Sequence, residues 1–330
     1  MNLWEGNGLK TLVLNQEKQK TKKVKSSVLS KKFIKNFKKY WGLYLLLLPT
    51  LIYVLIYHYY PMYGVQIAFR NFSPSAGILG SEFVGFKYFT KFLSSYRFWE
   101  LLKNTLSLSI WSLVCSFPVP IILALMLNQF KHKRYRSFIQ TVIYAPNFIT
   151  VVVLVGMLSI FLSPHTGIIN HLITAFGGES VHFLGQEKWF LPLYILSGIW
   201  QGAGFGTIIY LGALSGVSPE LYEAAKMDGA TKLQIIRHVD FPAIMPTIVI
   251  MFILAIGGVM NVGFEKVLLM QNDLNRGASD VIATYVYEIG IQQAQYSYSA
   301  AIGLFNSVIN AILLIGANQI SKRISDTSLW

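Results

Sequence analysis

The amino-acid sequence contains six stretches of at least 24 residues that hold no Asp, Glu, Lys or Arg. A helix needs about 20 apolar residues to cross the hydrocarbon core of a bilayer, and its backbone groups must be hydrogen-bonded within the segment. We therefore expect one helix in each stretch. The six predicted transmembrane helices cover residues 41–60, 104–127, 139–163, 191–214, 243–264 and 299–320.

The longest stretch, residues 137–178, is long enough for two helices. Pro164, Gly167 and Asn170 in its second half favour one membrane-spanning helix followed by a short surface element. A transmembrane β-barrel is excluded, because its strands would alternate polar and apolar residues and these stretches do not. The sequence therefore predicts an all-α integral membrane protein.

The composition agrees with a protein built in lipid. Hydrophobic residues make up 53% of the chain and charged residues only 13%, which is about half the charged share of a soluble domain. A disordered chain is excluded on the same grounds. The net charge of +13 would also suit nucleic-acid binding, but 11 of the 28 Lys and Arg lie in the first 40 residues and much of the rest between apolar stretches. We expect no nucleic-acid partner.

The distribution of basic residues predicts the orientation of the chain. A cytoplasmic N-terminus puts 20 of the 28 Lys and Arg on the inner side, as the positive-inside rule requires. Both termini are then cytoplasmic. We divide the chain into a basic N-terminal tail (1–40), a transmembrane domain (41–320) and a C-terminal tail (321–330). The N-terminal tail is either an interfacial helix on anionic membrane lipids or a solvated segment.

The predicted cytoplasmic segment 215–242 carries strong helix-boundary signals. Ser218 is a good N-cap and Pro219 suits the first helical position, while Gly229 fits a left-handed helix end. Thr231 and Gln234 form a capping box for a second helix, in which Leu233, Ile236 and Val239 are expected to share one face. We name residues 215–242 the elbow, and we expect Pro242 near the start of the fifth transmembrane helix.

The elbow pattern alone leaves two possibilities. Small side chains at Ala224 and Ala225 would let a partner approach closely, so the elbow can dock into a groove of another protein. The alternative is a surface helix pair that binds nothing. The pattern does not decide between them.

The elbow resembles the EAA loop of ABC-importer permeases, with the pattern E-A-A-x3-G-x9-I-x-L-P. Glu223-Ala224-Ala225, Gly229 and Val239-Asp240-Phe241-Pro242 keep the spacing, with Val for Ile and Phe for Leu. The resemblance extends over most of the chain after residue 40 and is closest to the oligosaccharide and polysaccharide permeases. It rests further on Ile199–Phe205, Gly263-Phe264-Glu265, Thr284–Tyr287, Gln295-Tyr296-Ser297, Gly303-Leu304-Phe305 and Ser328-Leu329-Trp330.

This resemblance implies a type I ABC importer permease fold in the bacterial inner membrane, and a division of labour. An extracellular solute-binding lipoprotein would deliver an oligosaccharide, a second homologous permease would complete the passage, and an ATPase dimer would grip the elbows. ATP and Mg²⁺ would bind the ATPase, so this chain would need no cofactor and catalyse no reaction. It contains no G-x4-G-K-[ST] phosphate loop. The coupling residues implied are Glu223, Ala224, Ala225, Asp228, Gly229, Ala230 and Pro242.

The predicted transmembrane helices contain no Asp, Glu, Lys or Arg. A charged solute or proton relay usually requires such residues, so their absence favours a neutral solute bound by amides, hydroxyls and aromatic faces. Asn306 and Asn310 are four residues apart and should share a helix face. For each candidate the alternative is an interhelical hydrogen bond or an interfacial aromatic ring. The candidates for the substrate passage are Trp200, Gln201, Asn261, Asn306 and Asn310.

Two other functional classes find less support in the sequence. A membrane-embedded enzyme would need a catalytic cluster, yet the sequence has no HExxH or GxSxG motif and no pair of intramembrane carboxylates. We expect no catalytic residue and no metal site, and the single Cys115 cannot form an intrachain disulfide. A self-sufficient channel or secondary carrier would be favoured by inverted repeats, which are not apparent.

Overall fold

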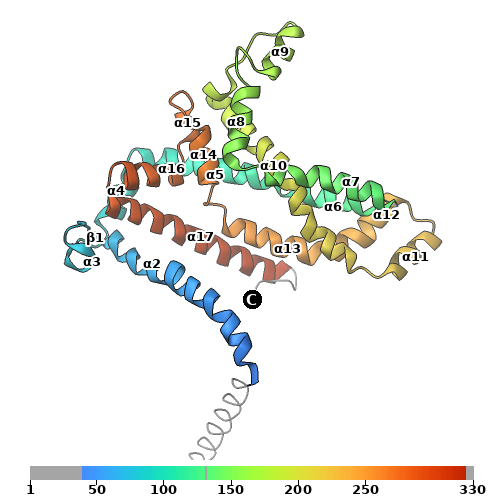
Figure 1. Cartoon of the computed structure of the whole chain (residues 1–330), viewed down its shortest axis with the longest axis horizontal. Helices are drawn as coiled ribbons and strands as arrows, with labels where there is room; N and C mark the ends of the chain where they lie inside the picture. The colour runs from blue at the N-terminus through green and yellow to red at the C-terminus, as the bar shows by residue number, and fades with distance from the viewer. Residues whose placement is uncertain (1–38, 131, 325–330) are drawn as a thin grey trace, which may run out of the picture. The chain divides into compact units, whose positions relative to one another are not determined.

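The computed structural model describes residues 39–130 and 132–324 (Figure 1). The N-terminal tail up to residue 38 and the last six residues lie outside this range, so the predictions made for them stay predictions. The chain divides into two compact units at Val65 and Gln66, which we describe separately.

The first unit contains most of a helical segment that covers Lys39–Phe69. Its winding changes along its length, from an α-helix over residues 39–54 to the π-helical turn η1 (Leu55–Tyr59), then α2 (Tyr60–Met62) and the 3₁₀ helix η2 (Tyr63–Phe69). This helix agrees with the first predicted transmembrane helix, 41–60.

The second unit is helical apart from one short antiparallel hairpin, in which Arg70 lies opposite Phe83. Its elements are β1 (Arg70–Asn71), α3 (Gly77–Gly80), β2 (Glu82–Phe83), α4 (Lys87–Leu93), α5 (Arg97–Ser116), α6 (Pro118–Asn128), α7 (Lys133–Tyr144), η3 (Ala145–Phe148), α8 (Val151–Phe161), α9 (Ile168–Ala175), η4 (Phe183–Gly185), α10 (Glu187–Ser215), α11 (Pro219–Met227), α12 (Lys232–Ile235), η5 (Ile236–Asp240), α13 (Phe241–Gly257), α14 (Phe264–Met270), α15 (Arg276–Ser279), α16 (Ile282–Tyr287), η6 (Glu288–Gln292) and α17 (Tyr296–Ile324).

Four helices in the described residues are long and apolar enough to cross a membrane, against the six that we predicted. They cover Lys39–Phe69, Arg97–Asn128, Lys232–Gly257 and Tyr296–Arg323. The predicted fourth helix, 191–214, corresponds to the 29-residue α10. Gln201 and several glycines lower the mean hydropathy of α10. For this reason α10 is not one of the four helices that are apolar enough to cross a membrane.

The third predicted helix, 139–163, is wrong as a single helix. It is a bent pair in which α7 with η3 meets α8 at an angle of 95°, and counting the pair as one crossing raises the total to five. Pro146 tightens the end of the first half into a 3₁₀ turn, because it lacks a backbone N–H. Thr150 then starts a new helix by accepting a hydrogen bond from the Val153 N–H at 3.3 Å.

The fifth predicted helix, 243–264, is too long at its far end. Helix α13 stops at Gly257, and residues 258–263 form turns and irregular backbone before α14 begins. Two consecutive glycines, Gly257 and Gly258, lower the helix propensity at that point. An unwound segment therefore lies inside an apolar stretch.

Helix α10 is the central element of the second unit, since α5, α6, α7 and α13 all pack against it. A side chain at Gly204 would collide with the backbone carbonyl of Ile143, and one at Gly206 would press on Pro120. These two glycines let α7 and α6 approach α10 closely, as small residues do in membrane bundles.

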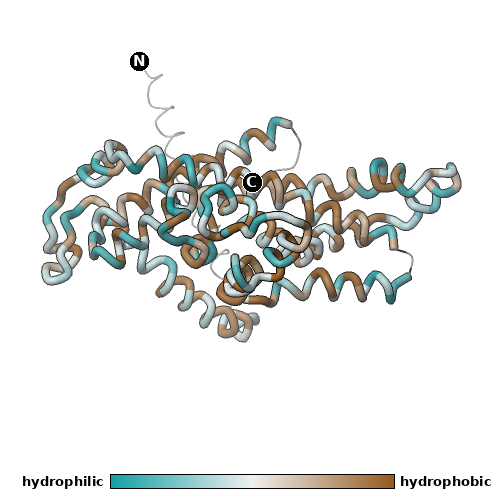
Figure 2. The backbone as a smooth tube through the Cα atoms, turned by 90° about the horizontal axis from the view of Figure 1, so that it is seen from above, coloured by the Kyte–Doolittle hydropathy of each residue, from teal (hydrophilic) through white to brown (hydrophobic). Residues whose placement is uncertain are grey.

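The outer surface of the long helices remains apolar. In the helices Arg97–Asn128, Lys232–Gly257 and Tyr296–Arg323, no more than 22% of the most apolar part is buried. Hydrophobic residues follow these helices, and hydrophilic residues concentrate in the connecting segments (Figure 2). Such a surface is stable only against lipid or another membrane subunit.

The helices α11 and α12 of the elbow lie at one end of the second unit, and α4 and α16 lie at the opposite end (Figure 1). Helices α8 and α9 project to one side. An apolar cluster fills each end: one around Phe92, Met260 and Ile282, the other around Leu127, Tyr210 and Ile244. The elbow is thus separated from the loops that we expect on the outer face.

Candidate functional site

The first helix of the elbow ends as its sequence predicts. Gly229 has a φ of +75°, a left-handed conformation that side-chain-bearing residues disfavour. The Gly229 N–H donates to the Lys226 carbonyl at 3.1 Å, and the Ala230 N–H donates to the Ala225 carbonyl at 2.9 Å. This pair of bonds is a Schellman motif. It turns the chain sharply and satisfies the free carbonyls of α11.

The two helix starts in the elbow are capped by side chains. Ser218 Oγ accepts a hydrogen bond from the Glu220 N–H at 3.3 Å. At the next helix, Thr231 Oγ1 accepts from the Gln234 N–H and Gln234 Oε1 accepts from the Thr231 N–H. The predicted capping box is therefore confirmed. Both caps fix where the helices begin, independently of any partner.

The second elbow helix differs from the prediction. It does not end before the transmembrane helix, because α12, η5 and α13 run on as one helix from Lys232 to Gly257. Pro242 lacks an N–H for the ordinary bond, and just before it the Phe241 N–H donates to the Ile236 carbonyl, which makes the turn π-helical. Of the residues expected on its apolar face, Leu233 is exposed and Ile236 and Val239 are half-buried, while the neighbouring Ile235 is buried.

The far side of the elbow is open to solvent. Ala224, Asp228, Gly229 and Pro242 are exposed, and Ala225 and Ala230 are half-buried. Glu223 is also exposed, but it lines a cavity on the side of the elbow that faces α6. Three apolar side chains are exposed beside them: Leu221, Leu233 and Met227, the last with 89% of its surface accessible. We call Leu221, Ala224, Met227 and Leu233 the elbow face.

The inner side of the elbow holds a polar cluster that the sequence reasoning missed. The carboxylate of Asp240 is completely buried. The Tyr222 hydroxyl donates to Oδ1 at 2.6 Å, Asn128 Nδ2 donates to Oδ1 at 3.1 Å, and Gln129 Nε2 donates to Oδ2 at 2.7 Å. We call these four residues the Asp240 cluster. A signal for it existed in the sequence, namely an acidic residue at the start of a transmembrane helix.

The Asp240 cluster joins three elements: α11, the end of α6 and the π-helical turn η5 that leads into α13. Burial raises the pKa of Tyr222 to about 12, and the hydrogen bond to Asp240 contributes to the increase. Tyr222 therefore stays a hydrogen-bond donor over the physiological pH range. Asn128 Nδ2 also lies 3.3 Å from the Tyr222 hydroxyl.

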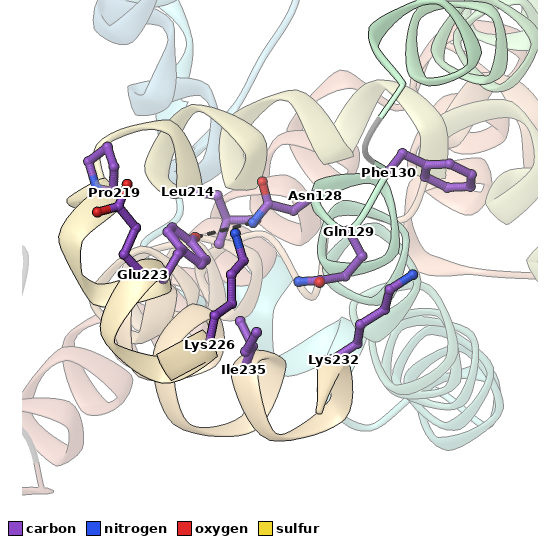
Figure 3. A pocket seen from close by; sticks show the side chains of 10 residues that line it. Asn128, Gln129, Phe130, Leu214, Pro219, Glu223, Lys226, Lys232 and Ile235 are labelled. Carbon is purple, nitrogen blue, oxygen red and sulfur yellow. Dashed lines mark hydrogen bonds between the residues drawn. The ribbon is translucent and has the colours of Figure 1, made fainter. Parts of the chain in front are cut away.

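A cavity of about 390 Å³ separates the elbow from the end of α6. Lys226 extends from the elbow towards Asn128 and Gln129 on α6, and Lys232 lies at the rim (Figure 3). Leu214 and Ile235 contribute apolar lining. The elbow is therefore not packed tightly on the bundle at this point.

The predicted substrate residues fall into two groups. Asn306 and Asn310 share a face of α17, as their spacing predicts, and the amide of each donates to Asn261 Oδ1, at 3.3 and 3.1 Å. Asn310 Oδ1 also accepts the Met260 N–H at 3.0 Å. These side chains satisfy backbone and amide groups of the unwound segment 258–263.

Asn261 also lines a cavity of about 260 Å³ between α5, α10 and the unwound segment. Ser109 and Ser112 on α5 line it too, and their hydroxyl oxygens are buried without a hydrogen-bond partner among the described residues. Buried polar groups are normally hydrogen-bonded, so these two hydroxyls are exceptions among the described residues. Neither serine was predicted, because single serines in apolar helices are common.

Trp200 and Gln201 are the second group. Gln201 Nε2 donates at 2.7 Å to the Ile149 carbonyl, beside the break between η3 and α8. The Trp200 ring is partly exposed and lines a separate apolar cavity of about 270 Å³ with Leu154, Met157 and Phe161. The structure does not bring these two residues to the asparagines through any described hydrogen bond.

No group of three or more His, Cys, Asp or Glu in the described part of the chain has the arrangement of a metal site. Cys115 is half-buried in α5.

Comparison with known proteins agrees with this architecture. The family model for the "Binding-protein-dependent transport system inner membrane component" matches residues 116–326. The polygalacturonan/rhamnogalacturonan transport system permease protein YteP of Bacillus subtilis (strain 168) is 46% identical over 288 residues, which is 87% of this chain and 90% of YteP.

Two solved structures are also similar. One is a bacterial alginate ABC transporter in complex with an alginate pentasaccharide-bound periplasmic protein, with a TM-score of 0.82 and 41% identity over 89% of this chain and 99% of the solved chain. The other is a bacterial ABC transporter involved in import of the acidic polysaccharide alginate, with a TM-score of 0.81, the same identity and the same coverage. The chain therefore belongs to the family of binding-protein-dependent transport system inner membrane components, the permease subunits of ABC transporters.

Proposed function

We propose that this chain is one of two permease subunits of an ATP-driven importer of oligosaccharides. An extracellular binding lipoprotein delivers the sugar, a second homologous permease completes the passage, and an ATPase dimer on the cytoplasmic side carries ATP and Mg²⁺. The elbow couples this chain to that ATPase. The observation that supports the proposal most directly is the capped elbow around Gly229 in a chain of this family.

The elbow face is suited to docking. Leu221, Met227 and Leu233 expose apolar surface, and exposed large apolar side chains are typical of interaction sites. The small side chain of Ala224 allows close approach of a partner backbone. In this proposal the ATPase binds an element that is shaped by the coupling residues. These are Glu223, Ala224, Ala225, Asp228, Gly229, Ala230 and Pro242.

The proposed orientation puts the elbow and both termini in the cytoplasm, in the cytoplasmic membrane of a bacterium. The position of α11 and α12 opposite α4 and α16 supports it (Figure 1), as does the distribution of Lys and Arg.

The proposed substrate is an oligosaccharide that contains acidic sugars. YteP is named for polygalacturonan and rhamnogalacturonan, and the similar solved transporter imports the acidic polysaccharide alginate. This revises our expectation of a neutral solute, which rested on the absence of charge from the predicted helices.

The proposed sugar contacts surround the unwound segment 258–263. Transporters commonly bind substrates where a transmembrane helix is interrupted, because free backbone groups and side chains converge there. Asn261, Ser109 and Ser112 line the adjacent cavity, and Asn306 and Asn310 orient Asn261. Trp200 and Gln201 remain secondary candidates.

The position of Lys266 supports the proposal that the substrate is acidic. Its side chain is 7% exposed, and its Nζ donates to the Tyr194 carbonyl at 2.7 Å and lies 4.5 Å from the Tyr194 ring centroid. Tyr194 lines the cavity beside Asn261. Neither of the two ion pairs found in residues 39–130 and 132–324 includes Lys266. A buried positive charge behind the cavity wall attracts a carboxylate, since low-dielectric surroundings screen it weakly.

Purification of the tagged chain from membranes tests the function. We expect an ATPase dimer and a second permease in the preparation, and import of a labelled oligogalacturonide into proteoliposomes that needs ATP and a binding protein. ATP-independent flux through the chain alone would favour a channel or carrier. A preparation that modifies the glycan covalently would favour an enzyme.

A further inference from the structure

Helix α11 is attached to the rest of the chain without a buried side chain. Apolar packing therefore contributes little to its position. A cavity of about 390 Å³ lies between the elbow and α6, so α11 is not held by close contact on that side either. Its position depends on its chain connections and on polar contacts.

The Asp240 cluster supplies those contacts. Tyr222 is the member on α11, Asn128 and Gln129 are at the end of α6, and Asp240 is in the turn η5 that leads into α13. Each donor points at the same carboxylate, at distances between 2.6 and 3.1 Å. One buried side chain therefore connects α11 to α6 and to the helix Lys232–Gly257.

The charge of Asp240 strengthens this connection. The two ion pairs in the described residues, Arg97–Asp280 and Arg276–Glu288, both lie outside the Asp240 cluster. Asp240 is thus held by neutral donors, and a buried carboxylate that loses its donors is strongly destabilised. A displacement of α11 must either carry α6 and α13 with it or break the contacts of the Tyr222 hydroxyl with Asp240 and Asn128. Carrying both helices keeps all three donors on the carboxylate.

We propose that Asp240 and Tyr222 form the mechanical link that carries movement of α11 to α6 and α13. Tyr222 and Asp240 are positioning residues here, since they act through the helices and touch no substrate. The inference rests on the proposed function, because the elbow moves only if an ATPase binds and displaces it. The elbow face itself contains neither residue. Docking of the ATPase and transmission of its movement are therefore separable.

The test uses the complete transporter, reconstituted with its binding protein and a labelled oligogalacturonide. The variant Tyr222→Phe removes one hydroxyl, and Asp240→Asn replaces the acceptor. We expect both variants to keep the ATPase in the complex and to keep hydrolysing ATP, while sugar imported per ATP hydrolysed falls roughly tenfold, the scale of one lost hydrogen bond to a charged group. Tyr88→Phe is the matched control, because Tyr88 donates a 2.7 Å hydrogen bond to Asn71 Oδ1 at the other end of the unit.

Several results would overturn the inference. Import per ATP within twofold of the unchanged protein in Tyr222→Phe would show that the cluster transmits nothing. An equal loss in Tyr88→Phe would show a general effect of removing a hydroxyl. Release of the ATPase from Tyr222→Phe would assign the cluster to docking instead. If Asp240→Asn does not fold, Tyr222→Phe decides alone. Failure of the proposed function would be distinguishable, because the unchanged chain would then carry no ATPase and show no import.

Discussion

The side-chain amide of Gln201 donates a 2.7 Å hydrogen bond to the backbone carbonyl of Ile149, 52 residues away in the sequence. This carbonyl lies where the third apolar stretch breaks by 95° between η3 and α8. A break in an apolar helix frees carbonyl groups that lipid cannot hydrogen-bond. Gln201 provides a donor for one of them, so the bend and the glutamine belong to one structural feature.

Gln201→Leu should therefore lower stability more than sugar specificity. The half-buried backbone carbonyl of Ile149 would lose this partner, which corresponds to a loss of about 0.5–1.5 kcal/mol. Thermal unfolding of the purified protein in detergent measures this change. The matched control is Gln293→Leu at an exposed position. An unchanged midpoint together with an altered ranking of imported sugars would instead assign Gln201 to the substrate.

Gly229→Val should uncouple the ATPase while the membrane helices still insert. A Cβ added at Gly229 would meet no atom within 4 Å, so the effect comes from the φ of +75° and amounts to about 1–2 kcal/mol of backbone strain. The binding-protein-stimulated ATPase rate of the complex measures the coupling. Gly202→Val is the control, because Gly202 is also in open space but lies within helix α10. Normal stimulation in Gly229→Val would contradict the role of the bend.

Asn310→Ala should impair import by disturbing the unwound segment 258–263. The Met260 N–H would lose its acceptor and Asn261 would lose one of its two amide donors. We expect the KM for the oligosaccharide to rise several-fold, since the loss of a buried hydrogen bond is about 1–3 kcal/mol. Initial import rates over a range of sugar concentrations measure this. Ser307→Ala on the exposed side of α17 is the control, and an equal effect there would contradict the assignment.

Lys266 should make import of acidic sugars sensitive to alkaline pH. Lys266 lies beyond the last helical residue, Gly257, of the fifth transmembrane helix. Burial lowers its pKa to about 8 from the ordinary value of 10.5, so the positive charge is present below pH 8 and is lost above it. The KM for an acidic oligosaccharide should increase above this pH, and that for a neutral one should not.

Lys266→Met should abolish this pH dependence, and Lys188→Met, at an exposed position on α10, should keep it. Import of both sugars with identical pH profiles in the unchanged protein would remove the evidence for an acidic substrate.

The elbow could be predicted in detail because its signals are local. Caps, the glycine turn and the capping box each involve residues within a few positions of one another, such as Thr231 and Gln234. The Asp240 cluster could not be predicted, because Asp240 and its amide partners are 111 and 112 residues apart. The hydropathy of the sequence located the apolar stretches, but it did not show where a helix within a stretch is interrupted. The local signals for the two breaks are weak, and each break also has a distant partner, Gln201 for Ile149 and Asn310 for Met260.

Accessibility of the elbow face tests the central claim most directly. Met227→Cys in a Cys115→Ala background puts a single thiol on the most exposed position of that face. We predict that a membrane-impermeant maleimide labels it in inside-out vesicles stripped of the ATPase, that bound ATPase protects it, and that intact cells show no labelling. Labelling of the same cysteine from outside intact cells would contradict the account.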